Sequence, residues 1–161
     1  MRVLGVDPGL AITGYGVVEA APTGDVQPIA YAAIRTSAQT PLAQRLAQLY
    51  DALARVITTY RPDVMAVERL FFGRNVTTAL TVGQARGVTL LCAAQHALEV
   101  VEYTPAEVKQ AVVGYGAAPK VQVQYMVQTL LHLNAVPRPD DVADALAVAV
   151  CHVFTSQAMT R

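Results

Sequence analysis

Short apolar runs that end on a carboxylate recur along this chain. Residues 3–6 lead to Asp7 in this way, and residues 64–67 lead to Glu68. Such a run, bounded by turn residues, is typical of a buried strand, and a charge at its end is costly unless something pairs with it. We therefore expect both acids at the carboxyl edge of a sheet, where α/β proteins bind ligands and metals. On Asp7 alone, the alternative that it merely caps the turn stays open.

The same patterning predicts helices and strands built around one sheet. Strands are expected over residues 3–7, 15–19, 29–36, 64–68 and 100–103. Helices are expected over residues 41–60 with Thr40 as the N-cap, from the loop at 70–75 to about 98, and over 105–114, 120–133 and 140 or 141 to 154. The first three strands are joined by short turns, which implies an antiparallel meander, whereas a strand after a helix suits a parallel crossover. The predicted class is α/β, with a five-stranded mixed sheet flanked by helices.

The last predicted helix carries acids only in its first turn. Residues 142–154 are apolar almost all round, which indicates a buried helix. Asp144 lies four residues after Asp140 and three after Asp141, so it shares a helix face with either of them. A first-turn acid complements the helix dipole, which accounts most naturally for Asp140. It accounts poorly for Asp144, one turn further in.

Composition and charge narrow the class of protein. Hydrophobic residues make up 53% of the 161 residues and charged residues 15%, so we expect one well-filled domain. The formal net charge is zero, which weighs against an indiscriminate polyanion binder. We find no signal-peptide pattern and no uninterrupted apolar segment of membrane-spanning length, and expect a soluble, cytoplasmic protein. Cys92 and Cys151 lack zinc spacing and are interpreted as buried thiols.

Carboxylates gathered in one place imply divalent cations. Three or four such groups repel strongly at neutral pH, and oxygen ligands favour Mg²⁺ or Mn²⁺. The three histidines lie in helical patterns and give no zinc set. Two metals on such carboxylates support in-line phosphodiester hydrolysis, with one ion activating the water and the other stabilising the leaving oxygen.

The motifs together resemble one known family. They are GVDPG at residues 5–9, TGYG at 13–16, Glu68 with Phe71, GQARG at 83–87, VKQ at 108–110, VVG at 112–114, Lys120 and DVADALA at 141–147. In order and spacing they resemble the RuvC Holliday-junction resolvases, of the ribonuclease H-like fold. The resemblance implies one ribonuclease H-like nuclease domain over residues 1–156 with a short tail over 157–161. It implies a homodimeric endodeoxyribonuclease of recombination and repair, which resolves four-way junctions by paired symmetric nicks, and partnership with a RuvA/RuvB branch-migration complex.

The resemblance also implies a set of catalytic residues. Asp7 would bridge two Mg²⁺ ions, for which Mn²⁺ is a substitute. Asp144 would bind one ion, and Glu68 and Asp141 the other. The alignment of the Asp-Ala-Leu-Ala run selects Asp141 over Asp140, although Asp140 reaches Asp144 at spacing four. Lys120 opens a helix, an unfavourable place for a cation, and this fits a nearby phosphate or developing charge.

Further residues are expected to contact DNA or a second subunit. Phe71 would stack on a base unpaired at the junction, although paired aromatics in a loop more often pack against their own domain. The residues expected at the DNA are Phe71, Phe72, Arg74, Asn75, Lys109 and Lys120. Gly83 and Gly87 allow the close approach of another helix and match the family's dimer interface. Arg86 between them either faces DNA or holds its helix in place.

Three other functions fit part of this pattern. A phosphotransferase of the actin/hexokinase type has a related fold, but it needs a second Asp-x-Gly element and a second domain. A ribonuclease H-like nuclease acting on another branched or duplex nucleic acid fits the carboxylates equally well. A non-catalytic junction-binding protein is disfavoured because all the expected acids are present.

Overall fold

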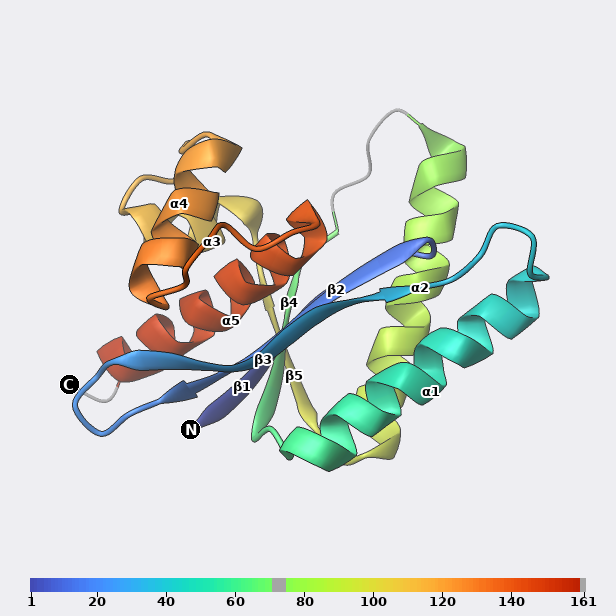
Figure 1. Ribbon diagram of the computed structural model, residues 1–161, viewed down its shortest axis with the longest axis horizontal. Coiled ribbons are helices and arrows are strands. Elements are labelled where there is room, and N and C mark those ends of the chain that lie inside the picture. The colour runs from blue at the N-terminus through green and yellow to red at the C-terminus, as the bar shows by residue number, and fades with distance from the viewer. Residues whose placement is uncertain (71–74, 160–161) are drawn as a thin grey trace.

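The computed structural model describes residues 1–70 and 75–159. The expected DNA contacts Phe71, Phe72 and Arg74 lie outside the described residues. The described chain forms an α/β fold with one sheet (Figure 1). Its strands are β1 (Arg2–Asp7), β2 (Ile12–Ala20), β3 (Val26–Arg35), β4 (Val64–Glu68) and β5 (Glu99–Tyr103). Its helices are α1 (Leu42–Tyr60), α2 (Val76–Gln95), α3 (Pro105–Val113), α4 (Lys120–Leu130) and α5 (Asp140–Met159).

The strand order is β3-β2-β1-β4-β5. β1, β2 and β3 pair antiparallel, and β4 joins β1 and β5 in parallel. This confirms the predicted mixed sheet and its crossover strand beside the first strand. The parallel pairing brings the carboxyl ends of β1 and β4 together at one edge of the sheet.

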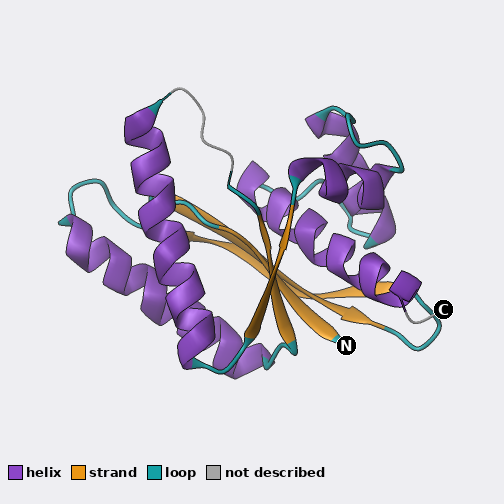
Figure 2. Ribbon diagram, turned by 180° about the vertical axis from the view of Figure 1, so that it is seen from behind, coloured by secondary structure: helices purple, strands orange, loops and turns teal. Residues whose placement is uncertain are grey.

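Helices cover both faces of the sheet (Figures 1 and 2). Because side chains alternate along a strand, Leu4 and Val6 lie in the core under α1 and α2, together with Met65 and Val67 of β4. Val3 instead lies in the core that contains the buried side of α5 and residues of α3 and α4. The helices α3, α4 and α5 therefore form one layer and α1 and α2 the other.

Glycines let α5 lie very close to the sheet. A Cβ atom built on Gly5 of β1 would lie 1.9 Å from the carbonyl oxygen of Ala145, and one on Gly14 of β2 would lie 2.0 Å from that of Asp141. Real Cβ atoms do not approach so closely, so any side chain at either position would push α5 outward. The first turns of α5 are thereby held directly over the ends of β1 and β2, which pair at Asp7 and Gly14.

Several boundaries differ from the predictions. The predicted cap at Thr40 is wrong: Pro41 is the N-cap of α1, without a side-chain cap bond, and the helix begins at Leu42. Proline fits there because it has no N–H to leave unpaired. The end of α5 also lies beyond residue 154: the helix continues to Met159, and within it Thr155 Oγ1 donates to the carbonyl of Cys151 at 2.8 Å.

The helix α5 is the one described helix that is long and apolar enough to cross a membrane by length and composition. The sequence pattern predicted a buried apolar helix here, but not one of membrane-spanning length. Its ten buried residues, from Val142 to Val153, pack in the core of the described fold, which accounts for their apolar character. The last turns of α5 lie beside the start of β1: Met1 and Gln157 line the same surface pocket. The acids at the other end of α5 lie at the opposite edge of the molecule.

Candidate active site

Asp7 and Glu68 are the last residues of the adjacent parallel strands β1 and β4. Val6 pairs with Val67, so the two acids, each the next residue in its strand, lie side by side. By the alternation along each strand, Asp7 shares a face with Gly5 and Glu68 shares one with Ala66, and this is the face that α5 covers. Both side chains are thus directed to the α5 side of the sheet edge.

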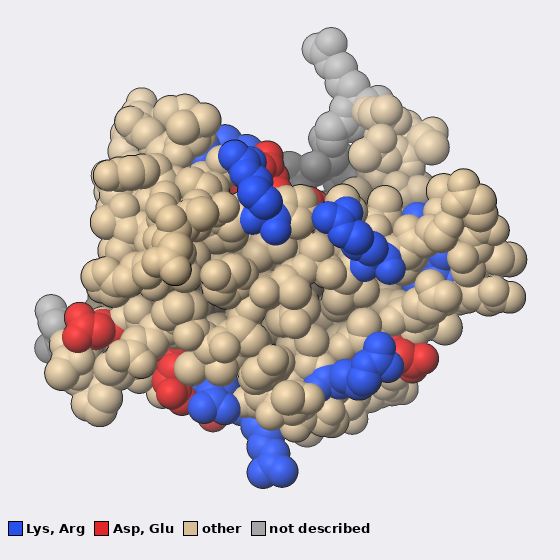
Figure 3. Space-filling view, in the orientation of Figure 1, with Lys and Arg blue, Asp and Glu red and all other residues tan. Residues whose placement is uncertain are grey.

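The start of α5 brings two more carboxylates to Asp7. Burial raises the pKa of Asp7 to about 7, together with the charges of Asp144, Asp141 and Glu68, in that order of effect. Burial also raises the pKa of Glu68 and that of Asp144, and the charge of Asp144 adds to the rise at Glu68. The acids from β1, β4 and α5 therefore act on one another as one negatively charged group. In Figure 3, acidic side chains lie in the hollow beside the α3 and α4 layer, with basic side chains next to them.

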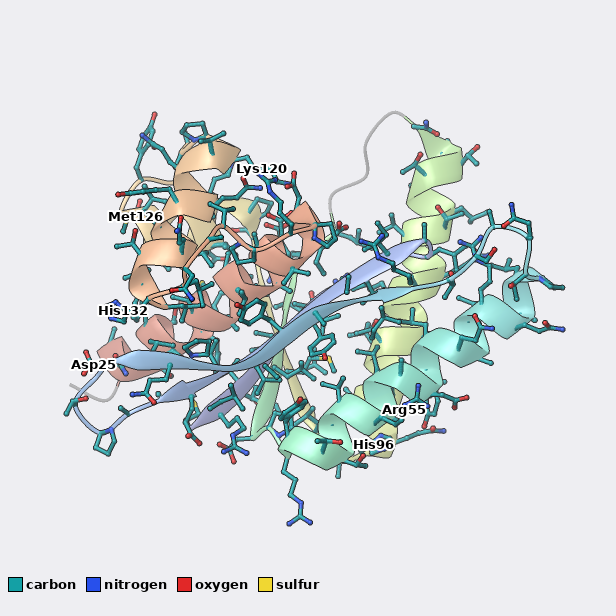
Figure 4. The ribbon with its side chains drawn as sticks, viewed as in Figure 1. Asp25, Arg55, His96, Lys120, Met126 and His132 are labelled. Carbon is teal, nitrogen blue, oxygen red and sulfur yellow. The ribbon has the colours of Figure 1, made fainter. Side chains whose placement is uncertain are left out.

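Lys120 is a cation that bonds directly to this group. It is the first residue of α4, and its Nζ lies 2.9 Å from Asp144 Oδ2 and 3.6 Å from Asp140 Oδ2. Figure 4 shows it where α4 faces the start of α5. Burial lowers the pKa of Lys120, but its bonds to Asp144 and Asp140 outweigh burial and the pKa is raised. Its unfavourable place at a helix start is thus explained by carboxylate partners, which the sequence reasoning did not identify.

Asp140 and Asp141 have different neighbours. Asp140 accepts a hydrogen bond from Arg138 Nη1. Although burial acts to raise the pKa of Asp140, Lys120, Gln124 and Arg138 lower it. Asp141 contributes to the raised pKa of Asp7. Asp140 therefore pairs with Lys120 and Arg138 at the surface, whereas the charge of Asp141 raises the pKa of Asp7, and the charges of both acids raise the pKa of Asp144.

A small cavity of about 220 Å³ opens beside the strand ends. Asp7, Glu68 and Arg86 are among its lining residues. Of the two roles considered for Arg86, the structure shows contacts within the chain: Nη1 donates to the carbonyl oxygen of Glu68 at 2.7 Å, and Nη2 to Glu102 Oε1 at 2.6 Å. The sequence reasoning missed Glu102; its place near the end of β5, the third parallel strand, was the available signal.

The other predicted residues belong to α2 and α3 or cap them. Lys109 lies in α3, and its charge lowers the pKa of Glu68. Asn75 is the N-cap of α2, where its side chain accepts from the Thr78 N–H at 3.3 Å. Gly83 and Gly87 lie on α2, and a Cβ built at either would meet no atom within 4 Å.

The carboxylates suit a hard divalent cation in their chemistry. No three of the His, Cys, Asp and Glu side chains in residues 1–70 and 75–159 are close enough, as they lie, to hold a metal ion. The available donors are nonetheless all carboxylate oxygens, the type that Mg²⁺ and Mn²⁺ prefer. Their mutual repulsion, seen in the raised pKa of Asp7, is the condition that a bound dication relieves. The residues present therefore fit the ions that the sequence analysis implied.

Comparisons with known proteins bear on this site. A family model described as crossover junction endodeoxyribonuclease RuvC matches residues 3–152. The chain is 50% identical over 159 residues to the crossover junction endodeoxyribonuclease RuvC of Caldicellulosiruptor saccharolyticus. The aligned residues cover 99% of this chain and 96% of that protein. A Thermus thermophilus RuvC structure matches with a TM-score of 0.91 and 37% identity, over 99% of this chain and 98% of that one. A T. thermophilus RuvC structure in complex with Holliday junction substrate matches with a TM-score of 0.90 and 34% identity over the same shares.

Proposed function

This chain belongs to the RuvC family of crossover junction endodeoxyribonucleases, and we propose that the carboxylate group around Asp7 is where it cuts DNA. The enzyme is a structure-specific endodeoxyribonuclease that resolves Holliday junctions in recombination and DNA repair. The observation that supports this site is the combined effect of Asp144, Asp141 and Glu68 on the pKa of Asp7. We assign the catalytic activity to residues 1–156, with residues 157–161 outside the nuclease domain.

The proposed cofactor is a pair of Mg²⁺ ions, with Mn²⁺ as a substitute. Asp7 would hold both ions, Asp144 one of them, and Glu68 and Asp141 the other. When bound, such a pair activates the attacking water and stabilises the leaving oxygen of an in-line displacement. The acids of β1, β4 and α5 supply the negative charge that concentrates dications at the sheet edge. Lys120, bonded at 2.9 Å to Asp144, is placed to exchange that carboxylate for a DNA phosphate.

The proposed DNA contacts surround the same edge. Lys109 lies on α3 and Lys120 on α4. The charges of both lower the pKa of Glu68, which indicates that both lysines lie near the carboxylates. Asn75 lies at the start of α2, where helix N–H groups also favour phosphate. Phe71 and Phe72 are assigned to stacking on bases at the crossover, and Arg74 to phosphate contact.

We propose that the enzyme acts as a homodimer through α2. Val76, Leu80 and Leu91 are 78%, 63% and 52% exposed, and they recur at helical spacing with Gly83 and Gly87. Together these residues form one apolar face, here called the α2 stripe, on the side of α2 away from the core. Exposed apolar residues in a row are typical of an interface, and glycines permit close approach of a second helix. A two-fold dimer matches a four-way junction that needs two opposed nicks.

The remaining assignments follow from the family. We propose that the dimer works with a RuvA/RuvB branch-migration complex on the junction. A cytoplasmic location is proposed because that is where such an enzyme meets its DNA substrate.

The test is nicking of a synthetic four-way junction by wild type and Asp7→Asn, with Mg²⁺, Mn²⁺ or EDTA and with linear duplex as a control. We expect Asp7→Asn to nick more than about a hundredfold more slowly, because it removes a metal ligand worth several kcal/mol. Its affinity for the junction in EDTA should stay within about threefold of wild type, since no proposed phosphate contact is lost.

The matched control is Asp25→Asn. Asp25 lies in the turn between β2 and β3, far from Lys120 (Figure 4), so its loss should leave nicking unchanged. Wild-type nicking by Asp7→Asn, or nicking that persists in EDTA, would overturn the proposed site.

A further inference from the structure

Arg86 is a buried charged residue that has no role in the proposed metal binding or DNA contact. Its residue is only 8% exposed, although arginine is rarely buried without partners. One arm of its guanidinium donates to the Glu68 carbonyl oxygen at 2.7 Å, and the other to Glu102 Oε1 at 2.6 Å. Both bonds are charge-assisted, and the planar fork fixes the two acceptors relative to each other.

The two acceptors lie at the ends of neighbouring strands. Val67 of β4 pairs with Glu102 of β5, and both face α2, whereas the side chain of Glu68 faces α5. Arg86 therefore contacts the backbone of Glu68 from one face of the sheet, while the carboxylate of Glu68 lies on the opposite face. The contact also comes at the last residue of β4, where the ladder to β5 ends.

The charge of Arg86 is compensated at Glu102 rather than at the carboxylate of Glu68. Glu102 lies 2.6 Å from Arg86, and Arg69 approaches the same carboxylate at 3.9 Å. The groups that lower the pKa of Glu68 are Lys109 and Lys120, on the opposite layer. Arg86 thus acts on the position of Glu68 through its main chain.

We propose that Arg86 is a positioning residue for Glu68, which clamps the end of β4 to β5 and α2 so that the Glu68 carboxylate is held facing Asp7. This rests on the proposed role of Glu68 as a metal ligand. Since α2 also carries the α2 stripe, the same clamp fastens the carboxylate group to the helix proposed for the dimer.

The test is Arg86→Lys, with Mn²⁺ as the probe. A lysine keeps the charge but has one ammonium, which cannot reproduce both arms of the fork. Unbound Mn²⁺ is measured by electron paramagnetic resonance during titration of the protein without DNA. We expect the Kd for Mn²⁺ to rise about tenfold or more, as is typical when a group that orients a metal ligand is lost. Excess Mn²⁺ should restore the maximal nicking rate, and junction affinity in EDTA should not change.

Arg2→Lys is the matched control. Arg2 has the same bonding pattern, with Nη1 on the carbonyl of Tyr60 and Nη2 on Glu19 at 2.9 Å, but it lies at the opposite end of β1. Its Kd for Mn²⁺ should equal that of wild type. Wild-type Mn²⁺ affinity in Arg86→Lys, or equal losses in both variants, would overturn the proposal.

If Arg86→Lys does not fold, Glu102→Gln replaces it. This variant keeps an acceptor oxygen for Arg86 while removing the charge, and it should raise the Kd in the same direction by a smaller factor.

Glu68→Gln separates this inference from the proposed function. If Glu68→Gln binds Mn²⁺ as wild type does, Glu68 is not a ligand and the proposed metal site is wrong. If Glu68→Gln is weakened and Arg86→Lys is not, the site stands and only the positioning role of Arg86 fails.

Discussion

At neutral pH the carboxyl group of Asp7 is divided between its protonated and charged forms, because its pKa is raised to about 7. Without a cation, deprotonation adds a negative charge to a partly buried group of like charges. The folded protein therefore binds this proton more tightly than the unfolded chain does, whose aspartate titrates near its ordinary value of 3.8.

This coupling predicts the pH dependence of stability in EDTA. As pH rises from about 4 to about 7, the folded state gives up the proton later than the unfolded state, so the free energy of unfolding falls across that window and stays low above it. Asp7→Asn removes the effect and should be more stable than wild type at pH 8, by on the order of 4 kcal/mol for a shift from 3.8 to about 7. Urea denaturation at pH 4 and pH 8 measures this, with Asp25→Asn as the control. A variant no more stable than wild type at pH 8 would contradict it.

The neighbouring acids of α5 give a second prediction. Asp141→Asn should lose nicking of a four-way junction more than about a hundredfold. Asp140→Asn should stay within about threefold of wild type, because Asp140 is engaged with Arg138 and Lys120. The two variants remove the same charge from adjacent positions, so each is the other's control. Equal losses would show that the choice of Asp141 is wrong.

At the scale of single residues, local patterning predicted the acids but not their partners. Asp7 and Glu68 end apolar runs, and that signal needs only a few neighbouring positions. The pairing of Lys120 with Asp144, and of Arg86 with Glu102, joins residues from different elements. Such pairs depend on how helices pack on the sheet, which no local pattern encodes.

Among the elements, α5 contributes two of the acids of the proposed site. Its apolar residues are buried around most of its circumference, and glycines on β1 and β2 leave room for the helix, whose acids Asp141 and Asp144 raise the pKa of Asp7. Hydrophobic periodicity predicted the helix and its burial. It could not predict the contact of Gly14 with Asp141, which joins the second strand to the last helix.

Gly14→Ala tests the role of this close contact. The added Cβ would lie 2.0 Å from the carbonyl oxygen of Asp141, so α5 must shift outward. We expect a loss of about 1–3 kcal/mol in the free energy of unfolding, the usual range for overpacking, and a loss of nicking larger than the change in stability explains. Gly116→Ala is the control, because its Cβ would have its nearest neighbour at 3.4 Å. Wild-type melting and nicking in Gly14→Ala would show that α5 does not depend on this contact.

For the whole molecule, the family match over residues 3–152 removes the phosphotransferase alternative, which required a second domain. The order of motifs had already predicted the fold and the resolvase activity. The proposed dimer had only Gly83 and Gly87 as its sequence signal, because residues on one helix face do not reveal whether that face meets the core or another subunit. The exposure of Val76, Leu80 and Leu91 is the new information.

Leu80→Glu should separate the subunits. A buried charge without a partner is strongly unfavourable in an apolar interface, so we expect the variant to be monomeric at concentrations where wild type is dimeric, by sedimentation velocity. Val121→Glu is the control, since Val121 is 75% exposed on α4, away from α2. A wild-type monomer, or a dimeric Leu80→Glu variant, would rule out the proposed α2 interface.

The ends of the described chain lie together, far from the carboxylates. Met1 and Gln157 line one pocket, and at about 1.5 Å per residue α5 places Asp141 about 27 Å and Asp144 about 22 Å from its other end. A fluorophore, an affinity tag or a surface tether attached at either end therefore stays clear of the cutting edge. Single-molecule measurements on immobilised enzyme can accordingly use both ends as handles.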